Sequence, residues 1–144
     1  MEQGFAWPVR VYFQDTDAGG VVYHASYVNF MERARTEWLR NVYDYSHGGM
    51  MRELGVAFVV RSMQLDYLKP ALLDDLLQVT AAIKSVGRSQ VAIQQTVRRG
   101  DEVLVTADIR LVCVAIERFR PVAIPDKLRA QWLPTGGDTG ILSS

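Results

Sequence analysis

Two periodicities of apolar and polar positions divide the N-terminal part of the chain. Over residues 8–14 apolar and polar side chains alternate, and this period of two predicts a first β-strand. Over residues 24–43 the apolar side chains instead recur at roughly 100° per residue, which predicts an amphipathic helix of about five turns. Its apolar arc holds Tyr27, Val28, Met31, Ala34, Trp38, Leu39 and Val42.

The rest of the chain returns to strand-like alternation. Residues 46–55 read as a loop with a short helix, and Gly55 closes it. Strands are then predicted within 58–70, 76–87, 89–100 and 102–117, followed by an extended piece at 118–125 and a short helix at 126–133. A strand, a long helix and then a run of antiparallel strands indicate the α+β class, with the helix packed on one face of the sheet. We expect one domain over residues 1–134 and a disordered tail at 135–144.

Composition narrows the functional classes without changing this architecture. The 144 residues carry 16 basic and 16 acidic side chains, so there is no overall basic field to attract nucleic acid. The single cysteine, Cys113, permits no intrachain disulfide, which fits a reducing compartment. No secretory signal pattern begins the chain, and no apolar run is long enough to span a membrane. These features predict a cytoplasmic protein.

Residues 15–24 hold the candidate chemistry. Asp15 and Asp17 flank one threonine, and if the strand continued their side chains would point the same way, as paired carboxylates do in acid–base catalysis. The alternative is that both aspartates only cap local turns. Gly19 and Gly20 would let a ligand approach the backbone closely.

The start of the long helix follows directly. No Ser, Thr, Asn or Asp precedes His24 to cap it, so its free N–H groups could polarise a carbonyl that a nearby carboxylate attacks directly or through water. The His24 side chain is either a base or structural. No spacing of histidine and cysteine predicts a metal site. Arg35 falls on the apolar arc, where we expect it to meet a carboxylate of Asp15, Asp66 or Asp108, or to lie at an interface.

These residues carry a resemblance to a known family. The stretch VRVYFQDTDAGGVVYHASYVNFMERARTEWLR resembles the signature of the 4-hydroxybenzoyl-CoA thioesterase family of hotdog-fold proteins, most closely the branch encoded with the bacterial Tol–Pal system. The similarity covers roughly residues 5–130. It implies an antiparallel sheet of five to six strands wrapped around one long central helix. It also implies protomers joined sheet edge to sheet edge, an active site at each interface, and a homotetramer built as a dimer of dimers.

The resemblance further implies an acyl-CoA thioesterase that needs no metal or redox cofactor, since CoA is part of the substrate. Asp17 would be the nucleophile or the general base, and the backbone N–H of His24 would polarise the thioester carbonyl. Further substrate contacts are expected from two groups of residues. Gly20 would let the substrate approach the backbone, while Tyr23, Tyr27, Phe30 and Phe58 could line an apolar pocket or belong to the core. Arg88, Ser89, Arg118 and Arg120 resemble the family's contacts to the CoA phosphates.

Two other functions remain open at this stage. The chain could bind acyl thioesters without turnover, as a scaffold that meets acyl carrier protein or the Tol–Pal envelope system, and it could be peripheral to the inner membrane. It could also be a hotdog dehydratase that uses His24, although no facing acid is evident in the sequence. The length of the acyl chain, and whether it is aromatic or aliphatic, are not predicted.

Overall fold

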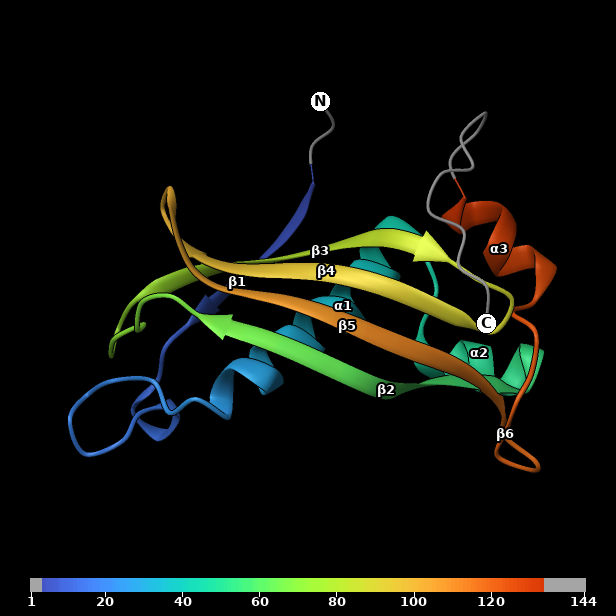
Figure 1. Cartoon of the computed structure of the whole chain (residues 1–144), viewed down its shortest axis with the longest axis horizontal. Coiled ribbons are helices and arrows are strands. Elements are labelled where there is room, and N and C mark those ends of the chain that lie inside the picture. The colour runs from blue at the N-terminus through green and yellow to red at the C-terminus, as the bar shows by residue number, and fades with distance from the viewer. Residues whose placement is uncertain (1–3, 134–144) are drawn as a thin grey trace.

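One antiparallel sheet curls around one long helix in the computed structural model, which describes residues 4–133 (Figure 1). The sheet has six strands, with β6 (Arg120–Pro121) paired beside β5. The other five follow the spatial order β1 (Phe5–Arg10), β3 (Leu76–Val86), β4 (Gln90–Arg99), β5 (Glu102–Ala115) and β2 (Val56–Tyr67). The α+β class and the predicted helix-in-sheet arrangement are confirmed. The tail predicted at 135–144 lies outside the described residues.

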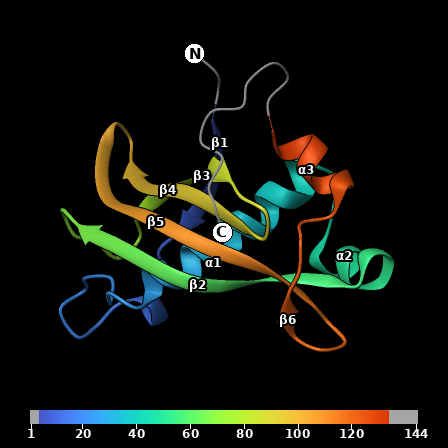
Figure 2. The same ribbon diagram turned by 45° about the vertical axis from the view of Figure 1, so that its right-hand side comes forward.

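The long helix α1 (Ser26–Val42) crosses the concave face of the sheet and packs against β1 and β3 (Figure 2). Its buried side chains recur every three or four residues, so they form one stripe: Tyr27, Phe30, Met31, Ala34, Trp38 and Leu39. Each large apolar side chain buried here stabilises the fold by about 1.5–3 kcal/mol. Five of the seven residues of the predicted arc are therefore buried, but Val28 is only partly buried and Val42 is half exposed, while Phe30 is buried without having been predicted.

Two short helices complete the fold at one end of the sheet. The helices α2 (His47–Leu54) and α3 (Asp126–Trp132) lie at the same end of the sheet as β6 (Figure 1). Ser46 caps α2 by accepting the Gly49 N–H at 2.9 Å, and Gly55 ends it in the left-handed conformation with φ of 67°. No helix in the described range is both long and apolar enough to cross a lipid bilayer.

The first strand differs from its prediction. It spans Phe5–Arg10 instead of 8–14, and the segment Phe13–Asp15 forms a single 3₁₀ turn, η1. The Asp15 carboxylate accepts the backbone N–H of Tyr12 at 2.8 Å, and this local hydrogen bond takes the place of further pairing in the sheet. The chain therefore leaves the sheet before it reaches the candidate chemistry.

Strand β2 is one edge of the sheet. It is 12 residues long, pairs only with β5 within the described chain, and carries a bulge between Val60 and Ser62. The other edge, β1, has six residues and includes Pro8, which cannot donate to a neighbouring strand. A long edge without proline is a natural template for pairing with a second chain.

Candidate active site

Asp17 lies at the tip of a tight hairpin that precedes α1. Its backbone N–H donates to the Val21 carbonyl at 2.9 Å, and its carboxylate Oδ1 accepts the Gly19 N–H at 2.9 Å. The hairpin is closed by a bridge between Thr16 and Val22. The Asp17 side chain is exposed, and none of the ion pairs found over residues 4–133 includes it. A carboxylate oriented by one backbone N–H and otherwise open to solvent is available for chemistry.

Asp15 and Asp17 do not form the aligned pair that strand geometry predicts. Because the strand ends at Arg10, the period-two argument does not reach them. Asp15 binds the N–H of Tyr12 in one turn, and Asp17 binds the N–H of Gly19 in the next. Asp15 therefore caps a local turn, as the alternative predicted. Asp17 also caps a turn, but it uses only one carboxylate oxygen to do so.

Gly20 makes this hairpin possible. Its φ of +79° lies in the region that other residues seldom adopt, and its carbonyl accepts the Leu73 N–H at 3.0 Å. That bond and the bridge between Val21 and Leu72 tie the hairpin to the segment before β3. Gly20 thus fixes the position of Asp17 against the rest of the fold.

The segment just before α1 offers a free backbone N–H close to the hairpin. Helix α1 begins at Ser26, two residues later than predicted, and its N-cap Ala25 has no side chain that could cap it. No acidic residue lies in the first turn. Within residues 4–133 no hydrogen-bond acceptor is found for the backbone N–H of His24. His24 follows Val21, whose carbonyl accepts the Asp17 N–H, by only three positions. A carbonyl oxygen could occupy that position.

A cavity of about 270 Å³ adjoins His24. It is lined by Val22, His24, Tyr27, Tyr67, Leu68, Lys69 and Pro70. The Tyr67 hydroxyl donates to the His24 carbonyl at 3.2 Å, and the two rings meet edge to face at 6.3 Å between centroids. Tyr67 therefore fixes the carbonyl of His24, the residue whose own N–H is the candidate carbonyl-binding amide. The sequence places Tyr67 only on an alternating strand, and nothing in it shows that the end of that strand returns to the helix start.

The two tyrosines predicted to contact the acyl group differ in environment. Tyr23 is 51% exposed and its ring lies 4.5 Å from that of His24. Tyr27 is buried, and its hydroxyl accepts the Ala71 N–H at 2.9 Å. Burial raises the pKa of the Tyr27 hydroxyl, while the bond from Ala71 opposes that rise. Tyr27 is neutral at physiological pH and forms part of the cavity wall.

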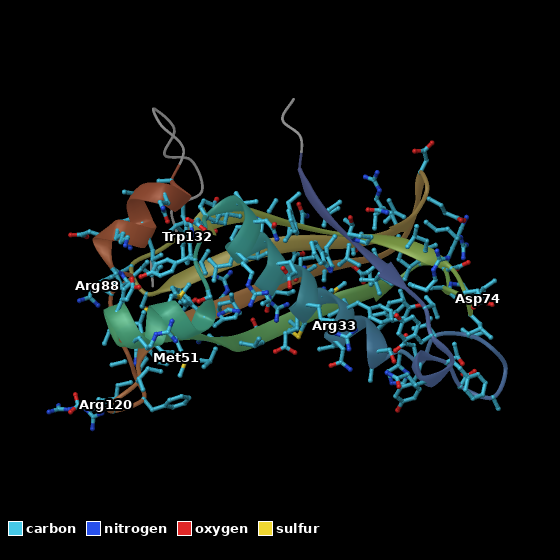
Figure 3. All side chains as sticks on the ribbon, turned by 180° about the vertical axis from the view of Figure 1, so that it is seen from behind. Arg33, Met51, Asp74, Arg88, Arg120 and Trp132 are labelled. Carbon is cyan, nitrogen blue, oxygen red and sulfur yellow. The ribbon has the colours of Figure 1, made fainter. Side chains whose placement is uncertain are left out.

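The four residues predicted to contact CoA phosphates lie at the end of the molecule opposite the Asp17 hairpin. Arg88 and Ser89 lie between β3 and β4, and Arg118 and Arg120 follow β5. Figure 3 shows Arg88 and Arg120 at one end of the molecule and Asp74, next to the segment that binds the hairpin, at the opposite end. Strand β2 runs between the two ends, from Val56 to Tyr67, a span of roughly 35 Å at strand rise. One chain therefore does not bring these residues to Asp17.

Arg35 does not find the carboxylate that the sequence predicts for it. Its guanidinium donates to Oε1 of Gln95 at 2.9 Å, and no ion pair found over residues 4–133 includes it. Burial lowers the pKa of Arg35, and the charge of Glu32 opposes that effect. Gln95 is fully buried and donates to the carbonyls of Met31 and Thr80, so its oxygen faces the arginine.

Other reactive groups give no second candidate centre. Over residues 4–133, no cluster of three or more His, Cys, Asp or Glu side chains could hold a metal ion. Cys113 is buried in β5, where burial raises the pKa of its thiol to about 11, so it stays protonated and unreactive.

Comparison with known proteins shows to which family the chain is similar. A family described as "Thioesterase superfamily" matches residues 19–106. The chain is 42% identical over 130 residues to "Acyl-CoA thioesterase YbgC" of Haemophilus influenzae, covering 90% of this chain and 95% of the relative. It is 49% identical over 129 residues to "Acyl-CoA thioester hydrolase YbgC" of Escherichia coli O157:H7, covering 89% and 95%.

A solved structure is similar as well. A probable thioesterase from Bartonella henselae superimposes with a TM-score of 0.80 at 32% identity. The match covers 85% of this chain and all of that structure.

Proposed function

The chain belongs to the thioesterase superfamily of hotdog-fold proteins, and we propose that it hydrolyses acyl-CoA to a free carboxylic acid and CoA. One observation supports this most directly. The exposed Asp17 carboxylate is oriented by a backbone N–H in a hairpin that leads straight to the free backbone N–H of His24. Hydrolysis of a thioester requires an amide that polarises the carbonyl and a carboxylate that attacks it or activates water.

The chemistry follows from these two groups. The thioester carbonyl accepts the His24 N–H, which stabilises negative charge as it develops on oxygen. Asp17 either attacks the carbonyl carbon, forming an anhydride that water then cleaves, or removes a proton from the attacking water. In both routes the C–S bond breaks, the acyl group gains the hydroxyl of water, and the thiolate of CoA gains a proton. Tyr67 restrains His24 by donating a hydrogen bond to its carbonyl.

The nucleotide end of the substrate requires a second copy of the chain. If two copies pair antiparallel along β2, the Val56 end of one lies beside the Tyr67 end of the other. That pairing brings the partner's Arg118 and the partner's Arg120 toward Asp17, where guanidinium groups suit phosphate oxygens. Association of two such dimers into a tetramer stays a prediction.

Release of thiol from a panel of acyl-CoA thioesters, followed with a thiol-detecting dye, tests the proposal. We expect CoA to appear continuously, in many-fold excess over enzyme. Tight binding of acyl-CoA with no thiol released would instead support the alternative, an acyl-thioester-binding or scaffold protein that meets acyl carrier protein or the Tol–Pal system.

A further inference from the structure

A second cavity, of about 410 Å³, lies between α1, α2 and the strands β2, β4 and β5. None of its lining residues belongs to the cavity at His24. Most of its wall is apolar, with contributions from Leu39, Met50, Phe58, Ile93, Leu111 and Trp132. Its volume lies in the lower part of the range of small-molecule sites, roughly 300–1,000 Å³.

One side of this cavity is polar. Arg35 lines it together with Glu32, Thr36 and His47. The only hydrogen bond found for the Arg35 side chain within residues 4–133 joins one nitrogen to the neutral Gln95. Glu32 is exposed and forms no ion pair with Arg35 in that range. A partly buried guanidinium with several unused donors favours an anion beside it.

A buried donor without an acceptor lies in the same wall. The indole N–H of Trp132 has no hydrogen-bond partner among the described residues, and the side chain is only 6% exposed. The Trp132 ring packs against that of Phe58 at 5.1 Å between centroids, so it is held firmly in the wall. Buried donors are rarely left unpaired in folded proteins, and a ligand oxygen would satisfy this one.

We propose that this cavity binds an apolar monocarboxylate, with its carboxylate beside Arg35 and its hydrocarbon chain against Met50, Phe58 and Leu111. Apolar walls select the chain, and the guanidinium and the indole N–H select the oxygens. The choice of a carboxylate over other anions rests on the proposed function, because hydrolysis of an acyl-CoA releases one. Occupation of the cavity itself requires no turnover.

Isothermal titration of the whole protein with octanoate, and with octan-1-ol as its uncharged match, tests this site. We expect octanoate to bind at least tenfold more tightly than octanol. In Arg35→Gln the affinity for octanoate should fall at least tenfold while that for octanol stays within twofold. Arg40→Gln is the matched control, because Arg40 lies on the same helix but pairs with Glu37 in solvent. It should change neither affinity.

A second variant tests the site independently, in case Arg35→Gln does not fold. Ala57 is the smallest side chain in the wall, and Ala57→Leu should weaken both ligands by reducing the space. Equal affinity of the wild-type protein for octanoate and octanol, or no octanoate binding at millimolar concentration, would overturn the inference. Hydrolysis of the acyl-CoA panel, measured on the same samples, separates the two proposals. Hydrolysis without octanoate binding refutes only the cavity, and octanoate binding without hydrolysis refutes only the reaction.

Discussion

At the scale of single residues, Gly20 determines whether the Asp17 hairpin can form. A Cβ added there would meet no atom within 4 Å, so only the φ of +79° opposes a side chain. Gly20→Ala should therefore lower the free energy of unfolding by about 1–2 kcal/mol, the cost of the left-handed conformation. Urea denaturation followed by circular dichroism measures this change.

The neighbouring glycine provides the control. Gly19 has no positive φ, and its added Cβ would lie 3.5 Å from the Asp17 carboxylate, an ordinary contact. Gly19→Ala should change the unfolding free energy far less than Gly20→Ala. Equal losses in the two variants would show that backbone conformation at Gly20 is not what holds the hairpin.

His47 reports the electrostatics beside Arg35. Burial lowers the pKa of its imidazole, the charges of Arg35 and Arg40 lower it further, and Glu32 opposes them. The chain has two histidines, so an NMR titration can follow each one separately. We expect His47 to titrate below the ordinary value of about 6.5, and Arg35→Gln to raise its pKa. A His47 pKa at or above the ordinary value in the wild-type protein would contradict this.

The same shift sets a direction for stability. The unfolded chain binds the His47 proton at a higher pH than the folded chain does. Stability should therefore fall as the pH drops from about 6.5 toward the folded pKa of His47, and this contribution stops changing below that value.

At the scale of elements, the proposed assembly depends on the edge strand β2. Ser62 and Gln64 are exposed on it, and lysines at both positions should block pairing with a second strand. We expect the Ser62→Lys, Gln64→Lys double variant to be monomeric by light scattering, with an unchanged circular dichroism spectrum and at least tenfold lower kcat/KM. Ala6→Lys, on the opposite edge β1, should keep the wild-type mass. A double variant with wild-type mass would exclude β2 as the interface.

How far the sequence predicts an element depends on how local its cause is. The stripe of α1 is predictable because each buried residue recurs one turn from the last. The end of β1 is an exception, because its cause is local but alternation alone does not show that the hydrogen bond from the Tyr12 N–H to Asp15 prevails over continued pairing in the sheet. The partner of Arg35 is not predictable either, since Gln95 lies 60 residues away.

At the scale of the whole molecule, the two groups of candidate site residues lie at opposite ends of one chain. The resemblance assigns Arg118 and Arg120 to the same site as Asp17, but only the structure shows that β2 separates them. Tyr67 was missed for the related reason that contacts between distant segments leave no pattern in the sequence. The separation of the two groups is the reason that the proposed function includes assembly.

Mixing two inactive variants tests whether the site is shared. Asp17→Asn lacks the carboxylate, and the Arg118→Gln, Arg120→Gln double variant lacks the phosphate contacts. After subunit exchange, each mixed dimer should contain one intact site, so activity should return to a substantial fraction of wild type. Activity no higher than the sum of the separate variants would place all these residues in sites within single chains.

The most direct test is the kcat of Asp17→Asn for acyl-CoA hydrolysis, with Asp15→Asn measured beside it. Asparagine can keep the hydrogen bond from Gly19 but can neither attack the carbonyl nor accept a proton from water. The account predicts that Asp17→Asn loses nearly all turnover with fold and assembly intact, while Asp15→Asn stays close to wild type. Activity of Asp17→Asn above about a tenth of wild type, a loss of less than about 1.4 kcal/mol in barrier terms, would contradict it.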